Sequence, residues 1–300
     1  MSATDVRVRE LAEADWLPAK RLRLLADVAG QNRLAIAGLA VIIFLTLFSF
    51  LGPVFYHTDQ ISTSLLLQDL PPAGAHLLGT TPEGRDEIGQ LMVGGQSTLE
   101  IGFAVAVLAT GFGLIWGAVS GFIGGILDAF MMRVVDALLA IPILFFVVLL
   151  AAILTPNLFI ISFAISVSSW PATARLVRGE VLSLRTRDFV AASTSFGARR
   201  WYVVFRHLTP NVLGITVVTA TLQIADAILI YAGLAFLGLG LPPPSTSWGK
   251  MLSNYVENNL YSGHWWEFWP AAICVVAIVL AVNVVGDGLH DMVESRLIRR

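Results

Sequence analysis

The stretch RGEVLSLRTRDFVAASTSFGARRWYVVFRHLTPN, residues 178–211, determines how the rest of the chain is organised. It is polar and rich in arginine, yet an apolar run precedes it and another follows it. Lys and Arg resist transfer across a bilayer, so short segments that are rich in them stay on the cytoplasmic side. We therefore place residues 178–211 in the cytoplasm and expect the flanking runs to cross a membrane.

The composition of the whole chain indicates a multi-pass membrane protein. Of its 300 residues 56% are hydrophobic and only 13% are charged, and the mean hydropathy is +0.75. A typical soluble domain carries about 25% charged residues. All but two of the 19 Lys and Arg residues fall on one side of a six-pass arrangement, the exceptions being Arg85 and Lys250. Both termini therefore belong with residues 178–211 in the cytoplasm.

Apolar runs predict an all-α integral membrane fold with six transmembrane helices, each of which needs about 20 residues. Residues 134–170 are too long for one helix, and the turn signal Thr155-Pro156-Asn157 divides them into two, the second short and continuing toward Leu176. The remaining four runs each predict one helix: residues 34–55, 101–127, 212–241 and 268–286.

These helices divide the chain into one membrane domain and a few polar segments. We expect residues 1–33 to form a cytoplasmic N-terminal segment, residues 34–55 the first transmembrane helix, and residues 56–98 an extracytoplasmic loop. Residues 99–295 form a core of five transmembrane helices that includes the polar segment 185–211, and residues 296–300 form a cytoplasmic tail.

The polar segment also carries a motif. Asp188–Gly197, followed by Phe205–Asn211, resembles the EAA loop of ABC importer permeases. Ala191 stands where that family usually has Glu, and Thr209 where it usually has Leu. The resemblance implies a short coupling helix that docks in a groove of a cytoplasmic ATPase. The residues expected to serve this coupling are Asp188, Phe189, Ala191, Ala192, Ser193, Phe196, Gly197, Arg199 and Arg200.

Four further blocks extend the resemblance over nearly all of the chain after about residue 33. They are HLLGT…GRD (76–86), GFIGG…MRVVD…IP (121–142), LAFLGLG…PPP…SWG (234–249) and NVVGDGL (283–289). Five ordered matches resemble the C-type permease subunit of dipeptide, oligopeptide and nickel ABC importers. They imply a type I ABC importer permease fold in the plasma membrane of a bacterium or archaeon.

The same resemblance implies the partners of the chain. These are a homologous second permease subunit, two cytoplasmic ATPase subunits, an extracytoplasmic substrate-binding protein and the lipid bilayer, with no nucleic acid. The chain lacks a phosphate-binding loop, because its only lysines, Lys20 and Lys250, are followed by Arg21 and Met251 rather than by Ser or Thr. We therefore expect it to bind no cofactor, and ATP and Mg to be used by the partner ATPases.

Chemistry on the chain itself is not predicted. The five histidines are scattered along the chain, and no two have the spacing of metal ligands on one helix. No Ser-His-Asp or Cys-His motif of a catalytic site can be recognised. We expect no catalytic residue and no metal site, and hence a transport subunit rather than an enzyme.

Acidic residues within apolar runs are costly in lipid and are functional candidates. Arg133 lies three residues before Asp136, so the two could pair on one helix face. Asp226 lies near the middle of a predicted helix, with Gln223 and Tyr231 about one turn away on either side. These three residues are candidates to line a translocation pathway, where the Asp226 carboxylate could receive a peptide amino group or a cation. A buried structural role is equally compatible with the position of Asp226.

The glycines of the second apolar run form a Gly113-x-x-x-Gly117-x-x-x-Gly121 face. Small residues on one face let helices pack closely in lipid. This face could therefore meet another helix of the same subunit or a second membrane subunit.

The function predicted best is one half of the translocation pathway of an ATP-driven importer for di- or oligopeptides. The same architecture could import nickel or another small solute. An ion-coupled carrier that uses Asp136 and Asp226 as a relay is a less favoured interpretation.

Overall fold

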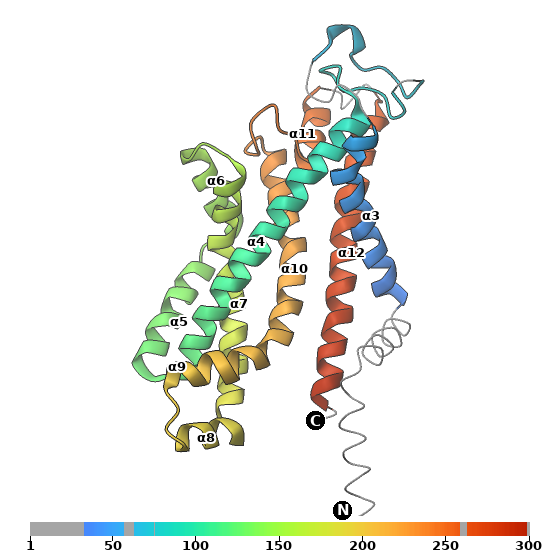
Figure 1. Cartoon of the computed structure of the whole chain (residues 1–300). Coiled ribbons are helices and arrows are strands. Elements are labelled where there is room, and N and C mark those ends of the chain that lie inside the picture. The colour runs from blue at the N-terminus through green and yellow to red at the C-terminus, as the bar shows by residue number, and fades with distance from the viewer. Residues whose placement is uncertain (1–32, 57–62, 75, 259–262, 299–300) are drawn as a thin grey trace, which may run out of the picture.

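The computed structural model describes residues 33–56, 63–74, 76–258 and 263–298, and within these ranges the chain is helical without a β-strand. Long helices lie side by side in an elongated bundle (Figure 1). Five are long and apolar enough to cross a membrane, and a bent pair of helices would make a sixth crossing if counted as one span. The five are α3 (Arg33–Phe55), α4 (Glu87–Ile123), α7 (Leu158–Arg185), α10 (Thr209–Phe236) and α12 (Trp265–Ile298).

The first helix, α3, begins and ends where the sequence predicted it. It is strongly apolar, yet only Gly38, Leu45 and Ser49 are buried by the rest of the chain. Gly38 lies against the backbone of α12, since a Cβ there would come within 2.8 Å of the Ala281 carbonyl oxygen. Val41, Ile42 and Phe48 pack partly against the core, while other apolar side chains of α3, such as Leu34 and Phe55, are exposed, as expected for a helix at the edge of a bundle in a membrane.

Helix α4 corrects the predicted boundary of the extracytoplasmic loop. We expected a loop to residue 98 and a helix over 101–127, but the helix begins at Glu87, where the Asp86 carboxylate accepts a hydrogen bond of 2.9 Å from the Gly89 amide. Its first three turns contain polar residues such as Gln90 and Ser97, which favoured a loop in the sequence but are buried in the helix. The helix ends at Ile123 because the next two residues are glycines with positive φ.

The run 134–170 also differs from its prediction. The break near Thr155–Asn157 is confirmed, and the Asn157 side chain caps the next helix by accepting from the Ile160 amide at 2.8 Å. The part before it is not one helix but two, α5 (Gly125–Leu139) and α6 (Ile143–Ile153). The two helices are bent by 79° relative to each other, and Pro142 is the N-cap residue of α6. The part after it, α7, is not short, because it continues through Pro171 to Arg185.

The polar segment after α7 folds into short helices. Helix α8 (Asp188–Ser195) is followed by Gly197 in a left-handed conformation, with φ of +78°, and then by α9 (Arg200–Tyr202). A π-helical turn, η2 (Val203–Leu208), connects α9 directly to α10, so the fifth long helix starts earlier than the predicted residue 212. Gly197 therefore separates two helical stretches, as the sequence predicted.

The other end of the bundle carries the 63–86 segment, with a short η1 turn (Leu65–Leu67), and α11 (Trp248–Asn258), which the sequence did not predict (Figure 1). The last helix, α12, is longer at both ends than the predicted 268–286 and finishes at the same end of the bundle as α8. Residues 1–32 and 299–300 lie outside the described residues. That the α8 end faces the cytoplasm stays a prediction from the distribution of arginine and lysine.

The glycine face of α4 packs against α7 of the same chain, which decides between the two interpretations of that face. A Cβ at Gly113 would lie 2.8 Å from the Trp170 carbonyl oxygen, one at Gly117 would lie 2.4 Å from that of Ala174, and one at Gly121 would lie 3.0 Å from that of Arg178. The two helices therefore approach backbone to backbone, which only glycine allows.

We predict that Gly117→Ala lowers the melting temperature of the detergent-solubilised protein, because the added methyl group overpacks the α4–α7 contact at a cost of about 1–3 kcal/mol. Gly111→Ala on the same helix is the matched control, since a Cβ there meets nothing within 4 Å. Equal melting temperatures for the two variants, measured by differential scanning fluorimetry, would contradict this packing.

Candidate functional site

The segment 185–211 lies at the α8 end of the bundle (Figure 1). Several of its apolar and basic side chains are exposed. Phe196 is 91% exposed and Trp201 is 57% exposed, and both lie outside the helices that are long and apolar enough to cross a membrane. Asp188, Arg199 and Ala192 are also exposed, and Ser193 is half-buried. The side chains of Phe189, Ala191 and Arg200 lie outside the described residues, so the predicted roles of these three stay predictions.

The same segment is tied firmly to the long helices. Val190 of α8, Val203 and Leu208 of η2, and Val177 and Val181 of α7 are buried in one apolar cluster. Arg185 at the end of α7 donates to the Phe122 carbonyl at 3.3 Å, next to the end of α4. A force applied to α8 would therefore reach α4, α7 and α10 through packed side chains.

Helix register changes where this segment joins α10. Residues 203–208 form a π-helical turn, and Pro210 follows immediately in the first turn of α10. Proline has no amide hydrogen to donate, so the regular hydrogen-bond ladder cannot continue through it. Single π-helical turns occur often at functional sites.

At the opposite end, the 76–86 block ties the 63–86 segment to the start of α4. The Asp86 carboxylate accepts a hydrogen bond of 3.1 Å from Tyr56 Oη and lies 2.9 Å from His76 Nδ1. The same carboxylate caps α4. Burial and the Asp86 charge raise the pKa of Tyr56 to about 12. Gly79 and Gly84 have positive φ, and a Cβ at Gly84 would lie 2.0 Å from the Ser64 carbonyl oxygen. The block is therefore a folding motif of this loop.

The 234–249 block connects α11 to α4 and α10. Trp248 is fully buried and donates through Nε1 to the Leu91 carbonyl at 2.9 Å. Ser97 Oγ donates to the Thr246 carbonyl at 2.5 Å. A Cβ at Gly249 would lie 2.4 Å from the Ala232 carbonyl oxygen, so α11 can sit this close to α10 only with glycine there.

The three residues predicted for the translocation pathway differ in their exposure in the structure. Gln223 is buried and accepts from Thr173 Oγ1 at 3.1 Å and from Thr110 Oγ1 at 3.4 Å, so it joins α10 to α7 and α4. Tyr231 is also fully buried. Asp226 is the one member of the trio with an exposed side chain. Gln223 and Tyr231 therefore belong to the interior of the subunit, while Asp226 faces outward from α10.

The predicted pairing of Asp136 with Arg133 is wrong, because Asp136 accepts from Arg175 of α7 at 2.6 Å. A second, better shielded pair lies one turn further along α7: Arg178 donates two bonds, 2.6 and 2.7 Å long, to the Asp128 carboxylate. Ser120 Oγ also donates to Asp128, so one carboxylate joins α4, α5 and α7. Asp128 was not predicted from the sequence, because nothing local to it marks a partner 50 residues away.

Comparison with known proteins establishes the family. Residues 110–299 match the model of the binding-protein-dependent transport system inner membrane component, and residues 30–72 match that of the N-terminal TM domain of oligopeptide transport permease C. The chain therefore belongs to the family of binding-protein-dependent ABC importer permeases, and it is of the C type, as the motifs indicated. The multi-pass membrane assignment agrees with this family.

Three relatives resemble the chain along nearly its whole length. The oligopeptide transport system permease protein OppC of Bacillus subtilis (strain 168) is 40% identical over 95% of this chain and 94% of its own length. The dipeptide transport system permease protein DppC of the same organism is 37% identical over 90% and 84%. The probable D,D-dipeptide transport system permease protein DdpC of Escherichia coli (strain K12) is 36% identical over 88% of each chain.

The two α5–α7 ion pairs make a matched comparison on one helix. We predict that Arg178→Gln destabilises the permease by about 3 kcal/mol, because it leaves a shielded carboxylate without its partner. Arg175→Gln should cost less than about 1 kcal/mol, because the Arg175 and Asp136 side chains are 55% and 49% exposed. Chemical unfolding in detergent measures both values, and equal losses would show that Asp128 is not the stronger link.

Proposed function

We propose that the chain is one of two permease subunits that together form the translocation pathway of a peptide importer in a bacterial or archaeal plasma membrane. A peptide is proposed as the cargo because the chain is similar, over nearly its whole length, to permeases named for oligopeptides and dipeptides. A separate extracytoplasmic binding protein would deliver the peptide to the end of the bundle formed by the 63–86 segment and α11. The chain itself would carry out no catalysis.

Energy would enter at the α8 end. We assign α8 as the coupling helix, with the exposed Phe196, Trp201 and Arg199 contacting one of two cytoplasmic ATPase subunits, which would use ATP and Mg. Two features support this assignment: the exposed aromatic residues and the buried contacts of Val190 with α7 and η2. Ala191 in place of the usual Glu leaves hydrophobic contact and geometry as the main basis of docking.

Asp226 would face the pathway or the second permease subunit. It is the exposed member of the predicted trio, and a carboxylate on a crossing helix is costly against lipid. A peptide amino group or another cation would offset that cost. Nickel or another small cationic solute is the second candidate cargo on the same grounds.

An ion-coupled carrier is favoured less by the structure. The relay suggested for it would need Asp136 and Asp226 to exchange a proton, but Asp136 is paired with Arg175 between α5 and α7. Uptake into proteoliposomes that contain the complete complex, supplied with ATP but without an ion gradient, separates the two: the importer transports peptide and the carrier does not.

We predict that Gly197→Val reduces peptide uptake per ATP hydrolysed at least tenfold, because a β-branched residue cannot adopt the φ of +78° without strain and would tilt α8. Gly179→Val is the control, since Gly179 lies in regular helix α7 and a Cβ there meets nothing within 4 Å. Membrane insertion should be normal in both. Unchanged uptake in Gly197→Val would remove α8 from the coupling mechanism.

We predict that Asp226→Asn lowers transport of peptides with a free amino terminus more than that of amino-acetylated peptides, because the substitution removes a charge and keeps the shape. Competition between the two peptide classes in the reconstituted complex measures the ratio. Asp287→Asn, at an exposed carboxylate of α12, is the control. An unaltered ratio in Asp226→Asn would assign Asp226 a structural role.

A further inference from the structure

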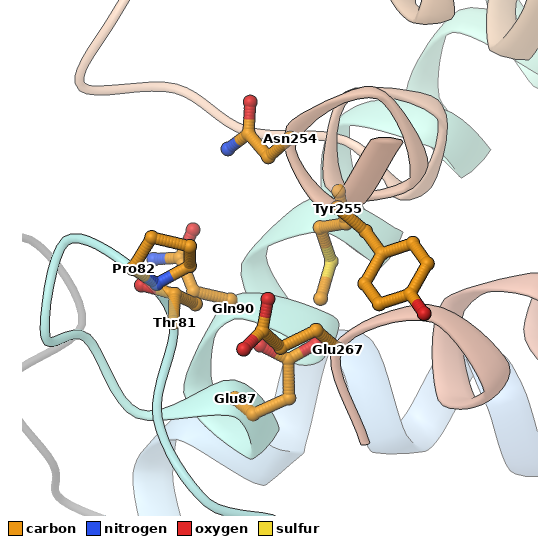
Figure 2. A pocket seen from close by; sticks show the side chains of 8 residues that line it. Thr81, Pro82, Glu87, Gln90, Asn254, Tyr255 and Glu267 are labelled. Atoms are coloured by element: carbon orange, nitrogen blue, oxygen red, sulfur yellow. The ribbon is translucent and has the colours of Figure 1, made fainter. Parts of the chain in front are cut away.

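Two buried carboxylates face a small pocket at the end of the bundle opposite α8 (Figure 2). Glu87 belongs to the first turn of α4 and is 1% exposed, and Glu267 belongs to the first turn of α12 and is 3% exposed. Thr81, Gln90 and Tyr255 line the same pocket. The pocket has room for about one water molecule and not for a peptide.

The charges around Glu87 are unfavourable as they stand. The groups that act on it most strongly through charge are Glu267, Asp86 and Glu83, all of them acidic. Its Oε1 atom is buried without a hydrogen-bond partner among the residues that the structure describes. A buried carboxylate needs a compensating charge or a proton, and here the strongest influences add negative charge instead.

Donor atoms with the right chemistry converge next to Glu267. His264 Nδ1 lies 3.2 Å from Glu267 Oε1 and 4.0 Å from Asp69 Oδ1, and one ligand atom from each of these three residues fits within a 4.8 Å group. The His264 ring is stacked on Trp266, with the centroids 4.8 Å apart, which limits its rotation. The sequence predicted no metal site because Asp69 lies far from the other two along the chain.

The His264–Glu267 contact is a hydrogen bond or ion pair as it stands, and its length is also compatible with two ligands of one zinc ion. Zinc binds His nitrogen and carboxylate oxygen at about 2.0–2.1 Å in a tetrahedral arrangement, which places two ligand atoms about 3.3 Å apart. The His264–Glu267 separation of 3.2 Å already has this value, and a small movement of Asp69 would bring it into the same arrangement. An imidazole ligand disfavours Mg²⁺ and Ca²⁺, which prefer oxygen.

We propose that Asp69, His264 and Glu267 bind a Zn²⁺ ion at the outer end of the bundle. The ion would add a direct link between the 63–86 segment, through Asp69, and the start of α12, through His264 and Glu267. Zn²⁺ here would be structural and would hold the outer surface of the permease in shape, apart from any transported cargo. The proposal is independent of whether the cargo is a peptide.

The test is zinc binding by the full-length permease, purified in detergent and stripped with EDTA. After dialysis against buffered Zn²⁺, elemental analysis of the monodisperse fraction should give one zinc per chain. His264→Gln and Glu267→Gln should each weaken binding at least tenfold. Zn²⁺ at 100 times the dissociation constant should favour the folded state about 100-fold, which appears as a rise in melting temperature.

The controls separate this site from surface binding. Glu100→Gln removes an exposed carboxylate from α4, and His290→Gln removes an exposed histidine from the other end of α12. Both should bind zinc like the unaltered chain, and millimolar Mg²⁺ should not compete. Because Glu267→Gln also relieves the repulsion with Glu87, it should fold and lose its response to EDTA and zinc.

Three results would overturn the proposal. One is the absence of stoichiometric zinc in the unaltered chain. Another is zinc binding that survives in both His264→Gln and Glu267→Gln. The third is a melting temperature that Glu87→Gln raises while EDTA and zinc change nothing, which would show that a shared proton neutralises the two glutamates.

Discussion

The close approach of α4 and α7 is the contact on which the rest of the bundle depends. Lipid tails are as apolar as leucine, so transmembrane helices gain little by hiding apolar surface from one another and associate through tight packing and polar contacts. Gly113, Gly117 and Gly121 bring the two backbones together. Along the same interface Ser120 and Arg178 meet at Asp128, which adds α5 to the pair. Helix α10 then joins through the buried Gln223, whose amide contacts both partners.

This arrangement gives the two ends of the molecule different properties. At one end α11, the 63–86 segment and the start of α4 are held by specific hydrogen bonds, such as that of Trp248 with Leu91, and by glycines that fit against backbone. At the other end the buried Val190 packs α8 against valines of α7 and η2, and the exposed Phe196 follows α8 directly. A part that receives motion from another protein must be firmly joined to the long helices and yet accessible, and the α8 end meets both conditions.

Much of the fold could be predicted from the sequence because a bilayer permits few kinds of backbone structure. Long apolar runs must be helices, since a backbone in lipid has to satisfy its own hydrogen bonds. That reasoning located α3 and the break before α7 correctly. It failed at the start of α4 and at α11, where polar residues such as Gln90 are buried by other segments. It also failed at the α5–α6 bend, which lies at a proline within a long apolar run.

The sequence by itself determined the class of protein, its multi-pass character and the helix–glycine–helix form of residues 188–202, because these depend on local composition and on motifs read in order. The tertiary structure alone decided which side chains meet. It paired Asp136 with Arg175, buried Gln223 and Tyr231 while leaving Asp226 exposed, and brought Asp69 to His264 and Glu267. Such contacts join residues that are tens to hundreds of positions apart, and their partners follow from how helices rotate and approach in three dimensions, which no local pattern records.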